Sequence, residues 1–504
     1  MYIFGAYPRC VAFYKEKIKV LLRKHVRGKE MKKVLIAICL GLLLTAPLLT
    51  TVGAVTYVPV AGGKGYIEKK SGYTDLFGGG EYVSIRFMRQ VPGKTYDVED
   101  AQFAVIWGND TNPNSIILYS EVTRYLGAAR VYDIHGGLVS GRAPIVVKTI
   151  WVQKLENIFE YYDANGDEVC NTNRNGILYS DHWWHEPVYK KVSLNTSWTR
   201  SPVNETLDPD GKHGSWTFSL TAENLTYTDI GITTPSGDNL LNKLTFTFHL
   251  EAQLVNVTAS VPCFNITVDA ANGYTIVDSE KVEVKEFNGT RVDYGVKYDH
   301  EIVGWDFDPK NPAPRLLLEW HAIVGNYIPE KTAEWLKEEL LSRIGNGTGT
   351  MVAETTNGTE IFNEEKANST RPRLIRVLKP ARLHLLDDWE KIGSLTWVTS
   401  VNVTENEGEE PTVMNMTAQI QGHQRITVPL PHGVYKGFAL LAGYSYPAGY
   451  RIYHDPEMTA STNILNISEI TSEPASTPLL QYAIAAVIGA AVAVGIIAVL
   501  KRRK

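Results

Sequence analysis

The sequence predicts a mainly β protein: one or more β-sandwich-like modules with one amphipathic helix, followed by a single C-terminal transmembrane helix. Three observations predict this. Apolar and polar residues alternate with period two along the middle of the chain, turn-forming residues separate these runs, and one uncharged apolar stretch near the end is long enough to cross a bilayer. With 504 residues, 44% of them hydrophobic, the chain can form about two to four domains with buried cores.

The N-terminal part is predicted to be removed or absent from the folded protein. Residues 31–54 begin with a methionine and two lysines, continue with an uncharged apolar run and end in small residues, which is the layout of a secretory signal peptide. We expect cleavage after Ala54. Residues 1–30 are basic, and they are either an extended start of this signal or lie upstream of a translation start at Met31.

The C-terminal part is predicted to anchor the chain in a lipid bilayer. Residues 479–500 are uncharged, and a helix of this length spans about 33 Å, enough for a hydrocarbon core of about 30 Å. The basic residues 501–504 follow directly and belong on the cytoplasmic side by the positive-inside rule. We therefore expect a single-pass protein of the cell membrane, with residues 55–478 outside the cell as an ectodomain.

Sequons for N-glycosylation are frequent between the two ends. The composition predicts roughly four Asn-x-Ser/Thr sequons by chance, whereas the sequence holds thirteen and none lies in the signal or the span. We expect a heavily glycosylated ectodomain whose sugars lie on its surface. The asparagines are Asn109, Asn195, Asn204, Asn224, Asn256, Asn265, Asn288, Asn346, Asn357, Asn368, Asn402, Asn415 and Asn466.

Two cysteines, Cys170 and Cys263, remain once the first 54 residues are removed. Outside the cell two remaining thiols most simply form a disulfide, and the alternative is two buried thiols. A Cys170–Cys263 bridge would close a long loop and stabilise the fold by about 4 to 5 kcal/mol in the chain-entropy model.

The ectodomain divides into β-rich and other segments. The clearest alternating runs are residues 81–88, 102–107, 215–221, 244–250 and 394–403, with turn clusters at 208–211 and 235–238. Short strands at this spacing are typical of sandwiches. From these patterns we predict a β-rich region over 55–328 with one or two sandwiches, a helix from Pro329 to Ile344 and a glycosylated loop over 329–372, a second β region over 373–460, and a Ser/Thr/Pro stalk over 461–478.

One loop carries the spacing of a calcium-binding site. Asp163, Asn165 and Asp167 place oxygen side chains at alternate positions around a glycine, and this resembles the first half of a calcium loop, with Asn171 as a further ligand. The alternative is a polar hairpin turn without a metal, because Asn-Gly-Asp is common in turns. Both interpretations stay open, so Ca²⁺ is the one cofactor that the sequence suggests.

The sequence holds none of the common catalytic and nucleotide-binding motifs. The sequence has no Gly-x-Ser-x-Gly, no Walker A loop, no GxGxxG after a strand and no HExxH, and we expect no enzyme. His182 and His185, next to two tryptophans, favour an ordinary strand or turn over a metal site or a sugar-stacking surface. Residues 55–478 carry 36 Lys and Arg against 53 Asp and Glu, an acidic balance that argues against a nucleic-acid partner.

This layout resembles that of archaeal S-layer-type, membrane-anchored cell-surface glycoproteins: a signal peptide, a long glycosylated β ectodomain, a short stalk, one C-terminal span and a basic tail. The resemblance implies a structural or protective role in the cell envelope, with self-association or contacts to other envelope proteins that divalent cations strengthen. The alternative is a surface binding protein, either a receptor for a carbohydrate or solute or an adhesin that contacts surface glycans.

Overall fold

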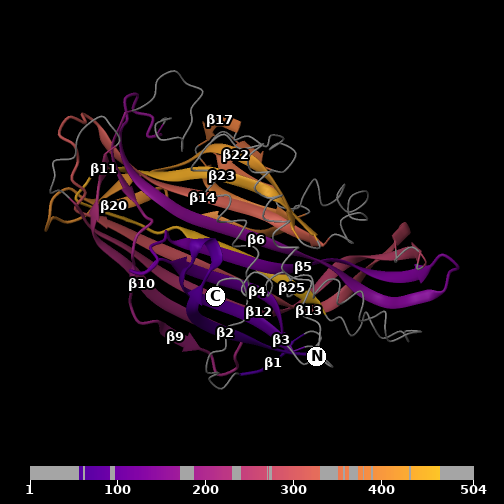
Figure 1. Ribbon diagram of the computed structural model, residues 1–504. Coiled ribbons are helices and arrows are strands. Elements are labelled where there is room, and N and C mark those ends of the chain that lie inside the picture. The colour runs from indigo at the N-terminus through magenta and orange to yellow at the C-terminus, as the bar shows by residue number, and fades with distance from the viewer. Residues whose placement is uncertain are drawn as a thin grey trace, which may run out of the picture.

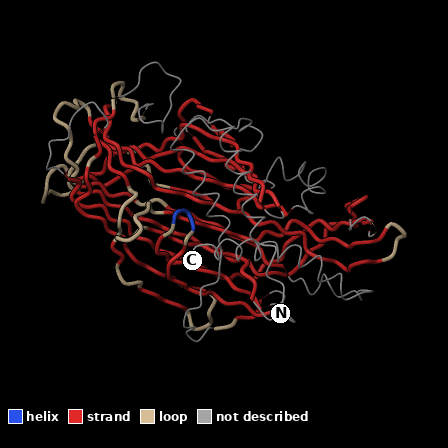
Figure 2. Tube along the Cα trace, in the orientation of Figure 1, coloured by secondary structure: helices blue, strands red, loops and turns tan. Residues whose placement is uncertain are grey.

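The computed structural model describes residues 56–60, 63–90, 97–170, 187–229, 240–269, 271, 275–329, 350–355, 358–362, 373–378, 380–387, 390–430 and 433–465. Most of them lie in β-strands, as Figure 2 shows, which confirms the mainly β prediction. The one helix among them is a single 3₁₀ turn, Leu76–Gly78.

The strands, labelled as in Figure 1, are β1 (Val58–Val60), β2 (Gly63–Thr74), β3 (Gly80–Gln90), β4 (Asp97–Trp107), β5 (Ile117–Asp133), β6 (Leu138–Tyr162), β7 (Val188–Ser193), β8 (Thr199–Arg200), β9 (Asn204–Leu207), β10 (His213–Thr226), β11 (Thr228–Asp229), β12 (Leu240–Asp269), β13 (Thr275–Val303), β14 (Pro314–Pro329), β15 (Thr350–Thr355), β16 (Gly358–Phe362), β17 (Arg373–Leu378), β18 (Pro380–Asp387), β19 (Glu390–Thr396), β20 (Ser400–Thr404), β21 (Thr412–Asn415), β22 (Thr417–Leu430), β23 (Gly433–Pro447), β24 (Arg451–His454) and β25 (Glu457–Leu465).

The strands form two layers. The first runs β1–β2–β3–β4–β5–β6–β14–β23–β22–β17, with β7 beside the end of β6 and β11 beside β7. The second centres on β10–β12–β13, with β8 and β9 beside β10. Along β13 it continues either to β24, β20 and β21 or to β25, β19, β18, β15 and β16. These pairs are all antiparallel, as expected for a sandwich.

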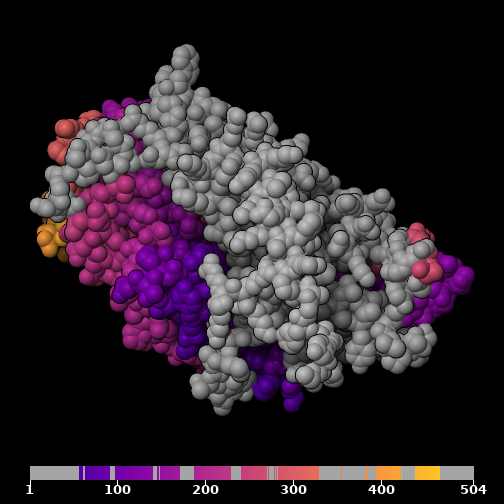
Figure 3. Space-filling model, in the orientation of Figure 1, coloured from indigo at the N-terminus to yellow at the C-terminus, as the bar shows by residue number. Residues whose placement is uncertain are grey.

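One parallel pair joins the two layers at a corner, where β12 lies along β5 over six residues. At this corner the paired ends of β5, β6, β12 and β13 project from the body, and Figure 1 shows them as an arm. Where the body is seen in Figure 3, residues of β2–β4 (indigo) lie beside residues of β9–β12 (magenta), and the Lys69 ammonium forms an ion pair with Glu205 across this boundary.

A single large core fills the space between the layers. Aromatic side chains meet across it, for example Trp107 of β4 with Phe218 of β10, whose ring centroids are 5.8 Å apart, and Phe103 of β4 with Tyr294 of β13 at 6.3 Å. Period-two alternation explains this arrangement, because every second residue of β10 and β12 faces inwards.

The two predicted β regions are joined by strand pairing. Strands from residues 373–460 pair with strands from residues 55–328: β23 pairs with β14, and β24 and β25 pair with β13. The two regions also share the same core cluster. The prediction of short strands was wrong, since β12 spans 30 residues and β13 spans 29, because no turn-forming cluster interrupts the alternation there.

Several predicted segments lie outside the described residues. They include the signal peptide and the residues before it, most of the helix of 329–344, most of the stalk, the membrane span and the basic tail. Pro329, the predicted first residue of the helix, is the last residue of β14. Within the described ranges there is no helix with the length and apolar character that a membrane crossing requires.

Candidate functional site

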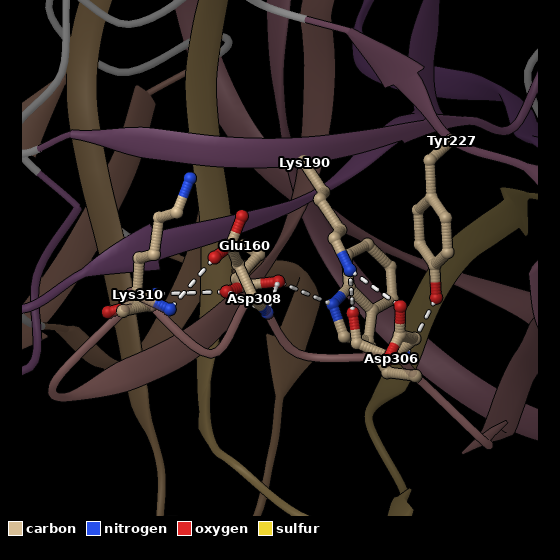
Figure 4. A network of polar contacts seen from close by, with 8 residues as sticks. Glu160, Lys190, Tyr227, Asp306, Asp308 and Lys310 are labelled. Carbon is tan, nitrogen blue, oxygen red and sulfur yellow. Dashed lines mark hydrogen bonds and ion pairs between the residues drawn. The ribbon is translucent and has the colours of Figure 1, made fainter. Parts of the chain in front are cut away.

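A network of buried polar groups lies at the end of the sandwich where β6, β7 and the β13–β14 loop meet (Figure 4). Glu160 of β6 is fully buried and pairs in register with Lys190 of β7. The loop between β13 and β14 passes beside both residues and brings Asp306 and Asp308 to them. The network therefore gathers an amine and three carboxyl groups from segments far apart in the sequence.

Glu160 is held by donors from the loop. One carboxylate oxygen accepts the indole N–H of Trp305 at 3.1 Å, and the other accepts the amide of Asn311 at 3.0 Å and the backbone N–H of Asp308 at 3.0 Å. Burial raises the pKa of Glu160, while these donors and the nearby Lys190 oppose that rise. Glu160 thus holds the β13–β14 loop against the end of β6 in the first layer.

Lys190 points at Asp306, as Figure 4 shows. Its ammonium donates to the Asp306 carboxylate at 2.8 Å and also to the Asp306 backbone carbonyl. The Tyr227 ring lies 5.0 Å from the same ammonium, and its hydroxyl accepts the Asp306 backbone N–H at 2.9 Å. Since the Lys190 side chain is 6% exposed and that of Asp306 is 40% exposed, the pair lies at the boundary between core and solvent.

The β13–β14 loop forms a turn at Asp308. The Asp308 carboxylate accepts the backbone N–H of Lys310, and its backbone carbonyl accepts that of Asn311. The Lys190 ammonium occupies the position beside the Asp306 carboxylate where a metal ion would bind. Among the described residues, no group of three or more His, Cys, Asp and Glu side chains is arranged to hold a metal ion.

The predicted calcium loop, which follows β6, is described except for Asn171. Both Asp163 oxygens accept backbone N–H groups, from Asp167 at 3.1 Å and Glu168 at 2.9 Å. Asn165 accepts the Asp167 N–H at 3.0 Å, and Gly166 has the positive φ of 69° that this turn requires. These are the contacts of a polar turn, and a Ca²⁺ ion at the loop stays a prediction.

The predicted Cys170–Cys263 disulfide is absent from the structure. Cys263 lies opposite Ala128 of β5, which lies opposite Pro144 of β6. Cys170 instead packs near Phe159 of β6. Residues 144 and 159 are separated by about 50 Å along a strand that rises about 3.3 Å per residue, far beyond the roughly 7 Å limit between bridged Cα atoms. The two thiols are buried in separate clusters.

The sequon asparagines are on the surface wherever the structure describes them. None of them is buried in that part of the chain, whereas four asparagines outside sequons are, namely Asn114, Asn157, Asn311 and Asn326. Asn346, Asn357, Asn368 and Asn466 lie outside the described residues. Exposed are Asn195, Asn204, Asn224, Asn256, Asn288, Asn402 and Asn415, and half-buried are Asn109 and Asn265.

A second polar cluster, which no sequence motif indicates, lies deep in the core. The Tyr446 hydroxyl of β23 lies 2.6 Å from His300 Nε2 of β13 and 3.0 Å from His454 Nδ1 of β24, so one phenol connects the two layers. Beside it, Tyr298 contacts the Tyr444 hydroxyl at 3.3 Å. Alternation along β13 places Tyr298 and His300 on one face, but sequence alone does not bring β23 and β24 to them.

Nothing in the described residues forms a recognisable catalytic centre. His135 and the glycine after it form the tight turn at the β5–β6 tip, where the Asp133 carboxylate accepts the backbone N–H groups of His135 and Gly137. His182, His185 and the two tryptophans between them lie outside the described residues. No protein-family model, no curated protein and no solved structure matches this chain.

Proposed function

We propose that this chain is a non-catalytic surface glycoprotein of the cell envelope with a structural or protective, S-layer-like role. A signal peptide over 31–54 would export it, and residues 479–500 would anchor it in the cell membrane with its C-terminus in the cytoplasm. The chain would associate with further copies or with other envelope proteins.

The observation that carries this proposal is the contrast between two kinds of asparagine. Sequon asparagines are exposed or half-buried wherever they are described, although buried positions for asparagine exist in the same fold. Sugars need solvent-facing sites, and the sequons supply them on both layers, for instance at Asn195 after β7 of the first layer and at Asn204 and Asn402 on β9 and β20 of the second.

The buried polar groups support a scaffold role. Glu160 and Lys190 use their hydrogen bonds to hold the β13–β14 loop, and the His300–Tyr446–His454 cluster connects the two layers. Such hydrogen-bonded groups between the layers favour one packed arrangement of the fold. The acidic balance of residues 55–478 suits display in the medium and bridging by divalent cations.

Electron microscopy of purified envelopes separates the proposal from its alternative. We expect a two-dimensional lattice that contains this chain and disperses when EDTA removes divalent cations. Isolated copies without lattice order, together with measurable affinity for a glycan or solute, would instead identify a surface receptor or adhesin. Turnover of a substrate that one carboxylate substitution abolishes would contradict both.

A further inference from the structure

The side chains of Lys190 and Asp306 meet in a setting suited to covalent chemistry. The Lys190 amine is 2.8 Å from an Asp306 carboxylate oxygen and has almost no exposed surface. Aromatic groups surround the contact: the Tyr227 ring lies against the amine, and the Trp305 indole packs on that ring with centroids 5.1 Å apart. The Lys190 amine is thus largely removed from water, while the Asp306 side chain that it contacts is 40% exposed.

A third group completes the arrangement. Glu160 lies directly opposite Lys190 in the β6–β7 register, and side chains of such a pair share one face with Cβ atoms about 4.5 to 5.5 Å apart. Glu160 is fully buried, and burial raises its pKa towards the protonated form. It is therefore placed beside the amine as a proton donor and acceptor.

We propose that Lys190 and Asp306 become joined by an amide bond between Lys190 Nζ and Asp306 Cγ. The ammonium first passes a proton to the Asp306 carboxylate, which leaves a neutral amine beside a carboxylic acid. The amine lone pair then attacks Cγ, and the C–N bond forms as one C–O bond breaks. Glu160 gives a proton to the departing hydroxyl and takes one from the nitrogen, so it ends unchanged and one water molecule leaves.

The proposed amide bond would connect the two layers of the fold. Lys190 lies in β7 at the margin of the first layer, while Asp306 lies in the loop that carries the chain from β13 in the second layer to β14 in the first. An amide bond here would close a loop of more than one hundred residues and fasten the two layers together. It would supply the covalent constraint that the distant cysteines do not.

Peptide mass spectrometry of the purified full-length protein tests the proposal. After denaturation and trypsin digestion, residues 175–191 should appear joined to residues 298–310, with a mass about 18 Da below the sum of the two peptides. Fragment ions should place the link between Lys190 and Asp306. Recovery of both peptides unlinked, or a link to Asp308 or Asn311, would overturn the assignment. The measurement does not depend on where the protein resides in the cell.

Matched variants identify the participating groups. Lys190→Arg keeps the positive charge but should abolish the linked peptide, whereas Lys191→Arg should leave it intact, because the Lys191 ammonium lies instead over the Phe159 ring at 5.5 Å. Glu160→Gln keeps a hydrogen-bond acceptor but cannot exchange protons, so unlinked peptides should accumulate. A fully linked Glu160→Gln protein would remove Glu160 from the mechanism.

Discussion

Acidification from pH 7 to pH 4.5 should lower the free energy of unfolding by about 3 to 5 kcal/mol through the two core histidines. Burial lowers the pKa of His454 to about 4, and burial with the nearby His454 lowers that of His300 well below its usual range. Both imidazoles are therefore neutral in the folded protein at pH 5. The unfolded chain binds their protons below about pH 6.5, which favours unfolding as the pH falls.

The surroundings of the pair compensate only weakly: the Asp299 charge and the Val398 carbonyl favour protonated His454, but burial outweighs both. The titratable groups that contact the two rings are the hydroxyls of Tyr298, Tyr444 and Tyr446, and His300 Nδ1 has no hydrogen-bond partner. His321, on the first layer, acts in the opposite sense: burial lowers its pKa, but Glu319 and Glu156 outweigh burial and raise it. Its contribution is complete below about pH 6.5 and is lost only as the pH rises.

Urea unfolding of the purified protein at several pH values measures this effect. In the double variant His300→Gln, His454→Gln the loss of stability between pH 6.5 and pH 4.5 should become clearly shallower, whatever its stability at pH 7. His135→Gln is the matched control, because His135 lies on the exposed turn at the β5–β6 tip, away from the core pair. An unaltered profile in the double variant would mean that the core pair does not govern acid sensitivity.

Replacing Arg89 with methionine should destabilise the protein by about 3 to 5 kcal/mol, because it leaves a buried carboxylate without a counter-ion. Arg89 of β3 binds Asp100 of β4 through two hydrogen bonds, from Nε at 2.7 Å and from the terminal nitrogen at 3.1 Å, and it also donates to Tyr125 at 3.2 Å. Arg89 is 4% exposed and Asp100 is 2% exposed.

A double-variant cycle checks that the cost comes from the orphaned charge. Arg89→Met with Asp100→Leu should recover most of the stability lost in Arg89→Met, since apolar groups can replace a buried ion pair at little cost. Arg291→Met provides the control: the Arg291–Asp293 pair is 43% and 32% exposed, so its loss should cost less than about 1 kcal/mol. A double variant no more stable than Arg89→Met would contradict this interpretation.

The alternation in the sequence predicted the strands better than it predicted their partners. The runs at 81–88, 102–107, 215–221 and 244–250 all lie in strands, whereas the run at 394–403 is divided between β19 and β20. Pairing depends on contacts between segments far apart in the sequence, such as β25 with β13, and no local pattern encodes these. For this reason the alternation predicts residues 373–460 only as a second β region and does not reveal that their strands pair with those of residues 55–328.

The polar sites were harder to predict, for two physical reasons. A β-bulge sets two residues of one strand against one of the next, and the bulge between β3 and β4 at Asp100 aims that carboxylate at Arg89. Spacing along the chain likewise does not report distance in space, so the sequence allows a Cys170–Cys263 bridge and gives no sign that Lys190 and Asp306 lie together. By contrast, the turn from Asp163 to Asp167 depends only on neighbouring residues. The structure shows there the hydrogen bonds of a polar turn, which is one of the two predicted alternatives.

Site-resolved glycopeptide mass spectrometry of the protein from its native membranes tests the central claim most directly. A surface glycoprotein should carry sugars at the exposed asparagines and begin at Val55, with occupancy lowest at the half-buried Asn109 and Asn265. Recovery of the peptides around Asn195, Asn204 and Asn402 in unmodified form, with the residues before Val55 still attached, would contradict export and glycosylation together.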